Sequence, residues 1–225
     1  MKANVRIKRG GGYAVYETAC SGNTTVAKLL DLINMEESDP VEWECSCQQN
    51  MCGSCAMLIN GRPALACAVF VRDTGENITL EPLTKFPLIK DLKVDRGRIR
   101  EIASAMKAYP AAGSEADIGG VDRQYLASSC LMCGCCMEVC PNYTGRDLFG
   151  GAMAANAMLR TIAQERDKRR RRELSSLYRR NQFNCCTKAL SCSEVCPIKL
   201  PLASTFSRLN SEMLRAFFGL PKGGG

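Results

Sequence analysis

The sequence contains no histidine among its 225 residues. This absence excludes zinc sites built from two cysteines and two histidines, iron–sulfur clusters with histidine ligands, and acid–base catalysis by histidine. Long apolar segments are also missing, and the longest run, Ala64 to Val71, is far too short to span a bilayer as a helix. Residues 1–6 lead into an alternating pattern and not into an apolar leader. We therefore expect a cytoplasmic chain with no signal peptide, no twin-arginine leader and no transmembrane segment of its own.

Aromatic residues are scarce as well, at 6% of the sequence. The arginine-rich run at residues 166–172 is not interleaved with aromatic side chains, which proteins that bind single-stranded nucleic acid use as stacking platforms. We therefore expect no nucleic-acid partner. The run has two other interpretations: a solvated helical face or loop, which we favour, or a docking site for an acidic partner or an anionic lipid surface. The net charge of +7 is compatible with both.

Cysteine, in contrast, is abundant, with 15 residues in the chain. In a reducing compartment many cysteines indicate metal or redox chemistry sooner than disulfides, and an odd number argues against a complete disulfide set. The most specific pattern spans Cys130 to Pro141 and has the spacing C-x2-C-x2-C-x3-C-P, which is typical of cubane iron–sulfur clusters. In this pattern three close thiolates hold one cluster and the fourth reaches for another, so a second cysteine group is required.

The required second group lies between Cys186 and Pro197 and has the same frame, except that Ala189 occupies the second ligand position. If the fourth cysteine of each motif crosses over, one site has four thiolates and is expected to hold a [4Fe–4S] cluster. The other site has only three thiolates because alanine cannot ligate, and it is expected to hold a [3Fe–4S] cluster. The predicted [4Fe–4S] ligands are Cys130, Cys133, Cys136 and Cys196. The predicted [3Fe–4S] ligands are Cys140, Cys186 and Cys192.

A third cysteine group has the spacing C-x4-C-x2-C with a fourth cysteine further on, as in plant-type [2Fe–2S] ferredoxins. Gly53 allows a tight path between the second and third ligands, and an Asn60-Gly61 hairpin turn would fold the fourth back toward the loop. A structural zinc site on four thiolates is the alternative, although zinc ribbons favour two C-x2-C pairs. The predicted [2Fe–2S] ligands are Cys47, Cys52, Cys55 and Cys67.

Four cysteines lie outside these three sets, and their roles stay open. Cys20 and Cys45 are interpreted as ordinary small residues. Cys135 or Cys185 is an alternative, irregular fourth ligand for the site with three thiolates.

The elements expected along the chain, together with the three cysteine groups, indicate an α+β protein with two domains. Residues 1–92 are expected to form a β-grasp domain of the plant-type [2Fe–2S] ferredoxin kind, and residues 93–225 an α-helical ferredoxin domain with two clusters. The first domain is expected to contain a hairpin at residues 3–9 and 13–17, a helix at 26–34 capped by Thr24-Thr25, a second hairpin at 56–59 and 64–66, and a strand at 78–81.

The second domain is expected to begin after a linker bracketed by Pro82 and Pro87. A helix is predicted from Val94 to Tyr109 because Pro110 ends it. Residues 111–120 are small and polar and are expected to form an exposed loop. A helix with an apolar side, carrying Met153, Ala157, Leu159 and Ile162, is predicted between the two motifs, and the glycines at 223–225 are expected to fray.

Further segments of the N-terminal part support a family assignment. They are Cys52-Gly-Ser-Cys55-Ala-Met, Asn60-Gly61, Leu65-Ala66-Cys67, Glu81-Pro82-Leu83 and Ile89-Lys90-Asp91-Leu92. Together with three clusters of these types in this order on one chain, they resemble the iron–sulfur subunit of succinate dehydrogenase and fumarate reductase. The resemblance covers nearly the whole chain.

The resemblance implies a non-catalytic electron-transfer subunit on the cytoplasmic side of the cell membrane, held there through its complex. Its implied partners are an FAD-binding catalytic subunit and a membrane anchor that binds quinone. The [2Fe–2S] cluster would lie near the flavin, the [4Fe–4S] cluster in the middle and the [3Fe–4S] cluster near the quinone. The chain itself supplies no acid, base or nucleophile.

The sequence departs from the family at two positions near the quinone end. Relatives that use ubiquinone often carry a tryptophan shortly after the cysteine that matches Cys140, and a histidine after the one that matches Cys186. Here these regions are Asn142-Tyr143 and Thr187. These departures favour menaquinone or an atypical membrane anchor. The choice between menaquinone and ubiquinone, the type of anchor and the direction of electron flow stay open. Two alternatives remain: the electron-transfer subunit of another flavoprotein or of a heterodisulfide-type reductase, or an interaction protein with structural zinc.

Overall fold

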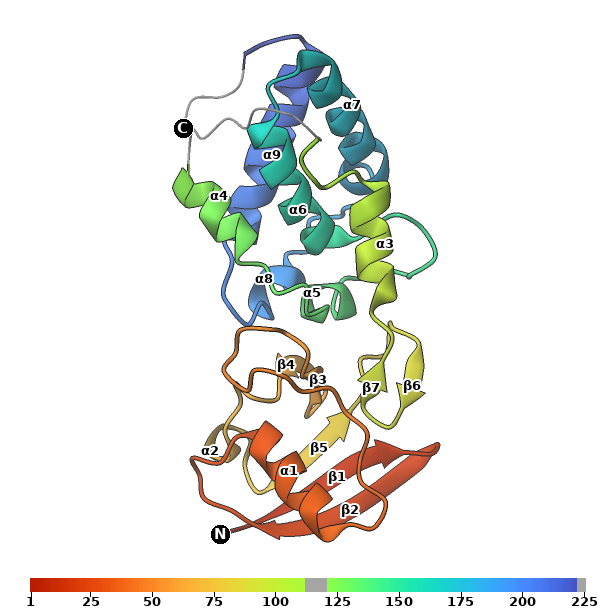
Figure 1. The fold of residues 1–225 in the computed structure, drawn as a ribbon, viewed down its shortest axis with the longest axis vertical. Helices are drawn as coiled ribbons and strands as arrows, with labels where there is room; N and C mark the ends of the chain where they lie inside the picture. Colours follow the sequence, from red (N-terminus) through yellow and green to blue (C-terminus); the bar gives the residue numbers. More distant parts are fainter. Residues whose placement is uncertain (112–120, 222–225) are drawn as a thin grey trace. The chain divides into compact units, whose positions relative to one another are not determined.

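The computed structural model describes residues 1–111 and 121–221 (Figure 1). The expected loop at 111–120, apart from its first residue, and the expected fraying at 223–225 therefore lie outside the described residues. The chain divides into two compact units. The first comprises Met1–Arg96 and Leu131–Glu138, and the second Gly97–Cys130 and Val139–Gly225. None of the helices within the described ranges combines the length and the hydrophobicity that a bilayer-spanning segment needs.

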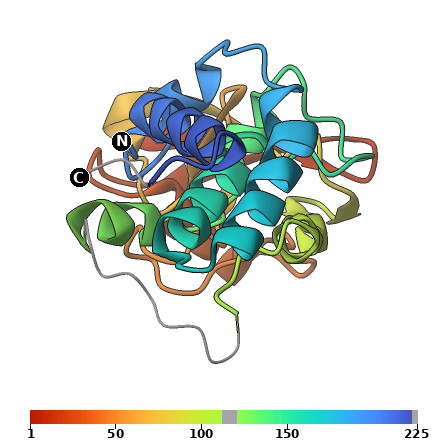
Figure 2. The same ribbon diagram turned by 90° about the horizontal axis from the view of Figure 1, so that it is seen from above.

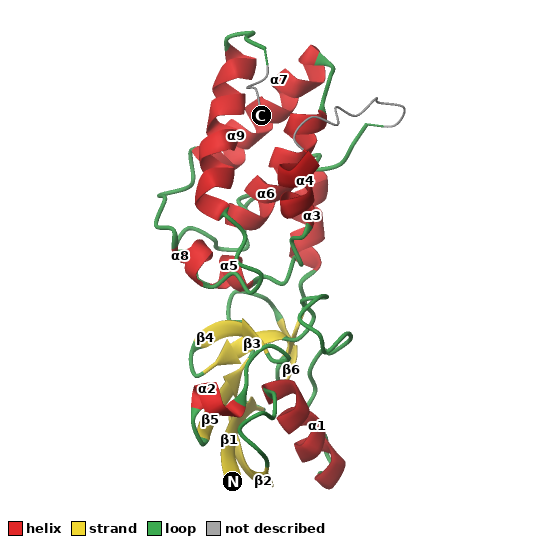
Figure 3. Cartoon of the chain, turned by 90° about the vertical axis from the view of Figure 1, so that its left-hand side faces the viewer, coloured by secondary structure: helices red, strands yellow, loops and turns green. Residues whose placement is uncertain are grey.

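A five-stranded mixed sheet with the order β2-β1-β5-β3-β4 forms the centre of the first unit (Figure 3). Strand β1 lies between β2 and β5 and pairs antiparallel with β2 and parallel with β5, as expected for a β-grasp domain. Its alternating residues Ala3, Val5 and Ile7 are fully buried because successive side chains of a strand point to opposite faces. The strands are β1 (Lys2–Arg9), β2 (Gly12–Ala19), β3 (Ala56–Ile59), β4 (Arg62–Leu65) and β5 (Asn77–Glu81).

The helix α1 (Val26–Glu36) contacts the sheet and confirms the predicted helix. Thr25 caps its N-terminus, and the side-chain oxygen accepts a hydrogen bond from the Lys28 amide at 3.2 Å. Its apolar stripe, Val26, Leu29, Leu30 and Ile33, is buried as the periodicity predicts. A short helix, α2 (Val71–Thr74), follows β4.

Both predicted hairpins are confirmed. In the second one the turn consists of only two residues, Asn60 and Gly61, which have φ angles of 49° and 77°. Two positive φ angles give the turn the twist that matches its strands, so β4 begins at Arg62 and not at Ala64 as predicted.

The predicted start of the next helix at Val94 is wrong. Val94 pairs with Leu88 in a small second sheet made of β6 (Leu88–Lys90) and β7 (Lys93–Val94). The helix α3 starts only at Gly97 and runs to Ala105. The periodicity missed these strands because they are only three and two residues long.

The second unit is helical, as predicted. Its helices are α3, α4 (Val121–Ser128), α6 (Gly151–Gln164), α7 (Lys168–Tyr178), a π-helical turn η1 (Arg179–Phe183), α8 (Ser191–Glu194) and α9 (Leu202–Phe217). The short helix α5 (Cys135–Glu138) belongs to the first unit. The long helices α6, α7 and α9 contact one another (Figure 2).

Helix α6 is the centre of the second unit because it also contacts α3 and α4. The sequence predicts one apolar side, but ten of its residues are buried, and they include Ala154, Ala155 and Asn156 in succession. A helix that is apolar on every side is typical of a core position. Its buried polar residue Asn156 is satisfied, since its side-chain amide donates to the Ala127 carbonyl at 2.6 Å.

Candidate metal centres

The loop between α1 and β3 carries the first predicted ligands, and its backbone is curled tightly. Gln48, Asn50 and Gly53 all have positive φ angles, of 52°, 57° and 76°. Such angles are uncommon outside glycine and indicate that the surrounding structure imposes the path. As a result, successive backbone amides turn toward the interior of the loop.

These amides donate to two of the predicted sulfur ligands. The amides of Gln49 and Met51 donate to Cys47 Sγ at 3.3 and 3.4 Å. The Asn50 amide donates to Cys67 Sγ at 3.3 Å. Hydrogen bonds to sulfur stabilise the thiolate form, which is the form that binds metal.

The predicted return of the fourth cysteine to this loop is confirmed. The β3–β4 hairpin places Cys67 beside Cys55, with 3.4 Å between their Sγ atoms. The two strands are further joined at this end by the Ala66 amide, which donates to the Cys55 carbonyl at 3.1 Å. Residues distant in sequence therefore bring their thiols to one place.

The thiols of this loop differ in their electrostatics. Cys52 is exposed, and hydrogen bonds from Ser54 and from backbone amides lower its pKa to about 6. Cys55 is buried, and desolvation raises its pKa to about 12. A buried thiol with a raised pKa ionises readily only when a metal cation supplies the compensating charge. At neutral pH the Cys52 thiol is therefore largely ionised, whereas the Cys55 thiol needs the charge of a metal to ionise.

The first predicted cubane motif is divided between the two units. Cys133 and Cys136 lie in the first unit, whereas Cys130 and Cys196 lie in the second. The pKa of Cys133 is lowered to about 7, mainly by a hydrogen bond from the Cys135 thiol and also by the charge of Arg96. The spare cysteine of this motif, Cys135, is fully buried beside a predicted ligand. The set of four remains a prediction from the spacing.

The three residues of the other predicted cubane set line one pocket of the second unit. Cys140 comes from the first motif, and Cys186 and Cys192 come from the second. Ala189 lines the same pocket. The pKa of Cys192 is raised by burial and by the neighbouring sulfurs of Cys140 and Cys186. Ala189, which stands at the second ligand position of its motif, therefore lines the same pocket as the three cysteines.

A buried glutamine joins the two segments that lead to this pocket. Gln182, in η1, precedes Cys186 and is fully buried. Its side-chain oxygen accepts from the Gly150 amide at 3.0 Å, and its side-chain nitrogen donates to the Leu148 carbonyl at 2.7 Å. These two bonds hold the loop that follows Cys140 against η1, the segment that precedes Cys186. At the rim, Thr187 and Asn142 are linked by a hydrogen bond of 2.9 Å between their side-chain oxygens.

The donor set consists of thiols, since each predicted ligand is a cysteine. Thiolates are the ligands that iron–sulfur clusters use in proteins, and the amide donors at Cys47 and Cys67 suit sulfurs that carry negative charge. These residues therefore fit the group in their chemistry. Within residues 1–111 and 121–221, no group of three or more cysteine or carboxylate side chains is placed to hold a single metal ion.

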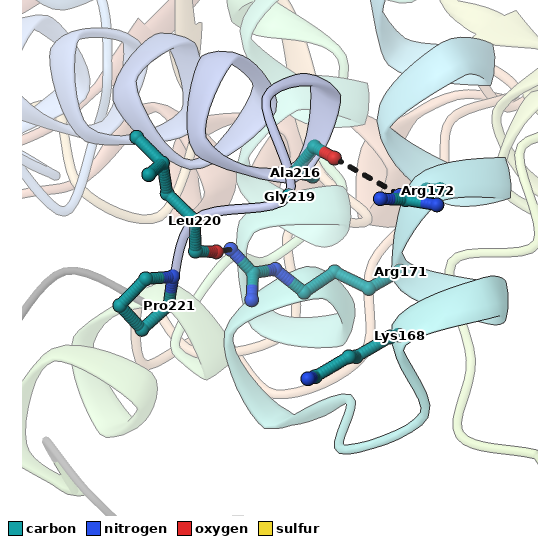
Figure 4. Close-up of a pocket in the computed structure, with 7 residues that line it drawn as sticks. All are labelled: Lys168, Arg171, Arg172, Ala216, Gly219, Leu220 and Pro221. Atoms are coloured by element: carbon teal, nitrogen blue, oxygen red, sulfur yellow. Dashed lines mark hydrogen bonds between the residues drawn. The ribbon is translucent and has the colours of Figure 1, made fainter.

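The arginine-rich run is only partly a solvated face, which corrects the favoured interpretation. Arg171 is buried and pairs with Glu212 of α9, and Arg170 Nε lies 2.8 Å from a Glu165 carboxylate oxygen. Arg171 and Arg172 also donate to the Leu220 and Ala216 carbonyls at the end of α9, at 3.4 Å each (Figure 4). Cations at a helix C-terminus satisfy its free carbonyl groups and its dipole. The run therefore joins α7 to α9, while residues 166, 168, 169 and 172 remain exposed.

The sequence did not identify three charged or polar side chains that hold the cysteine segments. Arg96 resembles its neighbours Arg98 and Arg100 in the sequence, so nothing distinguished it. Gln182 lies in a polar stretch, so nothing distinguished it from its neighbours either. Glu138 offered a signal, because a single carboxylate lies inside a motif that is otherwise apolar and rich in cysteine.

Comparisons with known proteins give the same domain order. A family model described as "2Fe-2S iron-sulfur cluster binding domain" matches residues 4–101, and one described as "4Fe-4S dicluster domain" matches residues 126–200. The chain is 31% identical to the fumarate reductase iron–sulfur subunit of Wolinella succinogenes over 212 residues, which cover 88% of each chain. It is 29% identical to the succinate dehydrogenase iron–sulfur subunit of Bacillus subtilis, over 82% of this chain and 78% of the relative.

A solved structure has the same fold. The match is to a chain of the Mycobacterium smegmatis Sdh1 complex in the apo form, with a TM-score of 0.70 and 22% identity. It covers 93% of this chain and 96% of the other. The predicted fold class, a [2Fe–2S] ferredoxin domain followed by a helical ferredoxin region, is confirmed.

Proposed function

The chain belongs to the family of iron–sulfur electron-transfer subunits of succinate dehydrogenase and fumarate reductase, and from this premise we propose that it transfers electrons between an FAD-binding subunit and a membrane quinone. The FAD-binding subunit would interconvert succinate and fumarate. The proposal gives this chain no acid, base or nucleophile of its own. Its contribution is to hold, separate and tune the redox groups.

Three sets of cysteines are proposed to hold these groups. The [2Fe–2S] set is Cys47, Cys52, Cys55 and Cys67. The [4Fe–4S] set is Cys130, Cys133, Cys136 and Cys196. The [3Fe–4S] set is Cys140, Cys186 and Cys192. When bound, such clusters exchange one electron at a time, whereas a flavin exchanges two.

One observation carries the proposal: the last cysteine of the first motif shares a pocket with the first cysteines of the second motif. Cys140, Cys186 and Cys192 meet in this pocket together with Ala189. A crossover of the fourth ligand is the distinctive feature of two-cluster ferredoxins. An alanine in the frame leaves three thiolates, which supports a three-iron cluster at this position.

The protein groups around each set would tune its reduction potential. Amide donors to Cys47 and Cys67 stabilise negative charge on the sulfurs and so favour the reduced, more negative cluster. In the second unit, burial of the pocket around Cys192 disfavours added charge. The chain thus gives the [2Fe–2S] set amide donors and the three-thiol set a buried pocket, and this difference would separate the reduction potentials of the two clusters.

The partners are proposed from the family. An FAD-binding catalytic subunit and a membrane anchor with quinone would place this chain peripherally on the cytoplasmic side of the membrane. Asn142 and Thr187, which are joined by a hydrogen bond at the rim of the pocket, stand where ubiquinone-using relatives often have other residues. This departure favours menaquinone or an atypical membrane anchor, and the choice between menaquinone and ubiquinone, like the direction of electron flow, is left to experiment.

Electron paramagnetic resonance of the anaerobically purified chain tests the clusters. We expect a [3Fe–4S] signal in the oxidised sample and a [2Fe–2S] signal after mild reduction. A colourless protein that contains only zinc would overturn the proposal. Affinity capture of the chain from its native cells tests the partner. Recovery of an FAD protein with succinate or fumarate activity is expected, whereas recovery of a different flavoprotein or a heterodisulfide-type reductase would contradict this part.

A further inference from the structure

The segment Leu131–Glu138 is the central part of the first cubane motif, yet it packs within the first unit. It carries Cys133 and Cys136, two proposed ligands of the [4Fe–4S] cluster. The rest of that unit includes the loop with the proposed [2Fe–2S] ligands. Two cluster-binding segments that are distant in sequence therefore belong to one packed body.

A single arginine is bonded to both segments. The guanidinium of Arg96 donates to the Gly53 and Ser54 carbonyls at 2.8 Å each, between two proposed [2Fe–2S] ligands. It also reaches the Cys133 carbonyl at 3.5 Å, a long contact. Glu44 forms an ion pair with it, and the Arg96 side chain is only 15% exposed. A planar guanidinium with five donors can serve several acceptors at once, which an ammonium group cannot do in the same geometry.

The two segments are in direct contact beside this arginine. A Cβ atom added to Gly53 would lie 2.8 Å from Cys133 Cβ and 3.0 Å from the Leu131 carbonyl oxygen. No side chain fits into that space without moving backbone. The glycine between the second and third [2Fe–2S] ligands is thus also a point where the other cluster segment packs directly against this loop.

A buried carboxylate holds the other end of the segment. Glu138 is 8% exposed, and one of its oxygens accepts from the Thr84 amide at 3.0 Å and from the Thr84 hydroxyl at 2.5 Å. Its second oxygen accepts from the Lys85 amide at 3.1 Å. Three donors compensate the buried charge, and hydrogen bonds to an ionised group are among the stronger ones in proteins.

We propose that Arg96 and Glu138 are positioning residues that fix the segment Leu131–Glu138 against the [2Fe–2S] loop and thereby set the distance across which electrons pass between the first two clusters. The inference rests on the proposed function, because it assumes that both segments hold clusters. Neither residue is a predicted ligand. Arg96 and Glu138 would act by fixing the distance between the two clusters, because electron transfer slows steeply as that distance increases.

The test uses the full-length chain with its clusters, prepared anaerobically. Arg96→Met removes the contacts with Gly53, Ser54, Cys133 and Glu44. Arg96→Lys keeps the positive charge but lacks the planar guanidinium with its several donors. Arg98→Met is the matched control: it removes an arginine two positions away whose contacts, with Glu101 and the Asp147 carbonyl, lie in the second unit. Two readouts are followed. The first is the magnetic interaction between the reduced [2Fe–2S] and [4Fe–4S] clusters, from microwave power saturation. The second is hydrogen exchange of residues 131–138.

In Arg96→Met we expect weaker magnetic interaction and roughly tenfold faster exchange of residues 131–138, which is the size expected when a charge-assisted hydrogen bond is lost. Arg96→Lys should lie between this variant and the parent, and Arg98→Met should match the parent. Unchanged magnetic interaction in Arg96→Met with both clusters present would overturn the proposal. So would an equal effect of Arg98→Met.

If Arg96→Met takes up no clusters, Arg96→Lys and the isosteric Glu138→Gln decide by the same two readouts. Unchanged magnetic interaction and exchange in both would overturn the proposal. The outcomes also separate it from the proposed function. If the parent chain itself shows no [2Fe–2S] and [4Fe–4S] signals, the proposed function fails. If the parent shows both signals and the variants behave like it, only the positioning role fails.

Discussion

Ala189 and Cys140 line the same pocket of the second unit, although they come from different cysteine motifs. In the frame of the second motif, Ala189 stands where a ligand is expected. The pocket therefore contains three thiols and one methyl group at the position of a fourth thiol.

Ala189→Cys should complete this site. We expect the cluster to take up a fourth iron, because four thiolates favour the [4Fe–4S] form. Most of the oxidised [3Fe–4S] signal should then disappear from the electron paramagnetic resonance spectrum, and the iron content should rise. Ser191→Cys, which adds a thiol to the same pocket outside the frame, is the control and should keep the signal. Survival of the signal in Ala189→Cys would show that the vacant position is assigned wrongly.

Gly53→Ala should be far more harmful than Gly61→Ala, although the two glycines have nearly equal φ angles of 76° and 77°. A Cβ atom at Gly61 meets nothing within 4 Å, so that variant bears only the backbone strain, about 1 kcal/mol. At Gly53 the Cβ atom would meet Cys133 and the Leu131 backbone, which should add about 1–3 kcal/mol. Thermal unfolding and the intensity of the [2Fe–2S] signal measure the difference. Equal losses in the two variants would contradict the close packing.

Alkylation of the metal-free chain should reveal the lowered pKa of Cys52. Because the pKa is about 6, the thiolate fraction, and with it the reaction rate with iodoacetamide, should rise through about pH 6 and level off above it. Ser54→Ala removes the largest cause and should move the midpoint to higher pH, whereas Ser46→Ala in the same loop should not. Cys55, whose pKa is raised to about 12, should stay unreactive at neutral pH. Peptide mass spectrometry resolves each site, and a midpoint near pH 8.5 for Cys52 in the parent chain would refute the assignment.

Glu212→Gln should destabilise the second unit. The Glu212 carboxylate lies 3.5 Å from Arg171, with side-chain exposures of 4% and 8%, so its loss leaves a buried cation without its counter-charge. We expect a loss of roughly 3 kcal/mol in the free energy of unfolding. The double variant Arg171→Met/Glu212→Leu should recover most of it, because apolar side chains of similar size need no counter-charge. Arg169→Met, at an exposed position of the same run, is the control. A denaturant titration in which Glu212→Gln matches this control would count against the buried pair.

Local chemistry accounts for the features that the sequence predicted well. The two hairpins and α1 follow from glycine turns, an Asn-Gly pair, a threonine cap and alternating apolar residues, all of which act within a few residues. The predictions were weakest where an element is very short, as in β6 and β7, or where a glycine and a linker obscure a boundary, as at the start of α3.

The candidate sites divide in a similar way. The return of Cys67 to the loop of Cys55 was predictable, because a hairpin turn lies between them. The division of the first cubane motif between the two units was not, because Leu131–Glu138 contacts partners far away in the sequence, and one of them, Arg96, is indistinguishable from its neighbours. The same holds for Gln182, whose two partners precede it by more than thirty residues.

By itself the sequence determined the family and the order of the [2Fe–2S] and dicluster domains, because cysteine spacing within a motif reflects the geometry of thiolates around a small cluster. The missing ligand at Ala189 stays a prediction from the same spacing. Only the tertiary structure decided which charges are buried. Arg171 looked like a solvated residue, yet it is buried against Glu212 of α9. Arg96 looked like its neighbours, yet it contacts two cysteine segments. A charged side chain is buried only when partners far away in the sequence compensate its desolvation, and those partners are assembled by the fold.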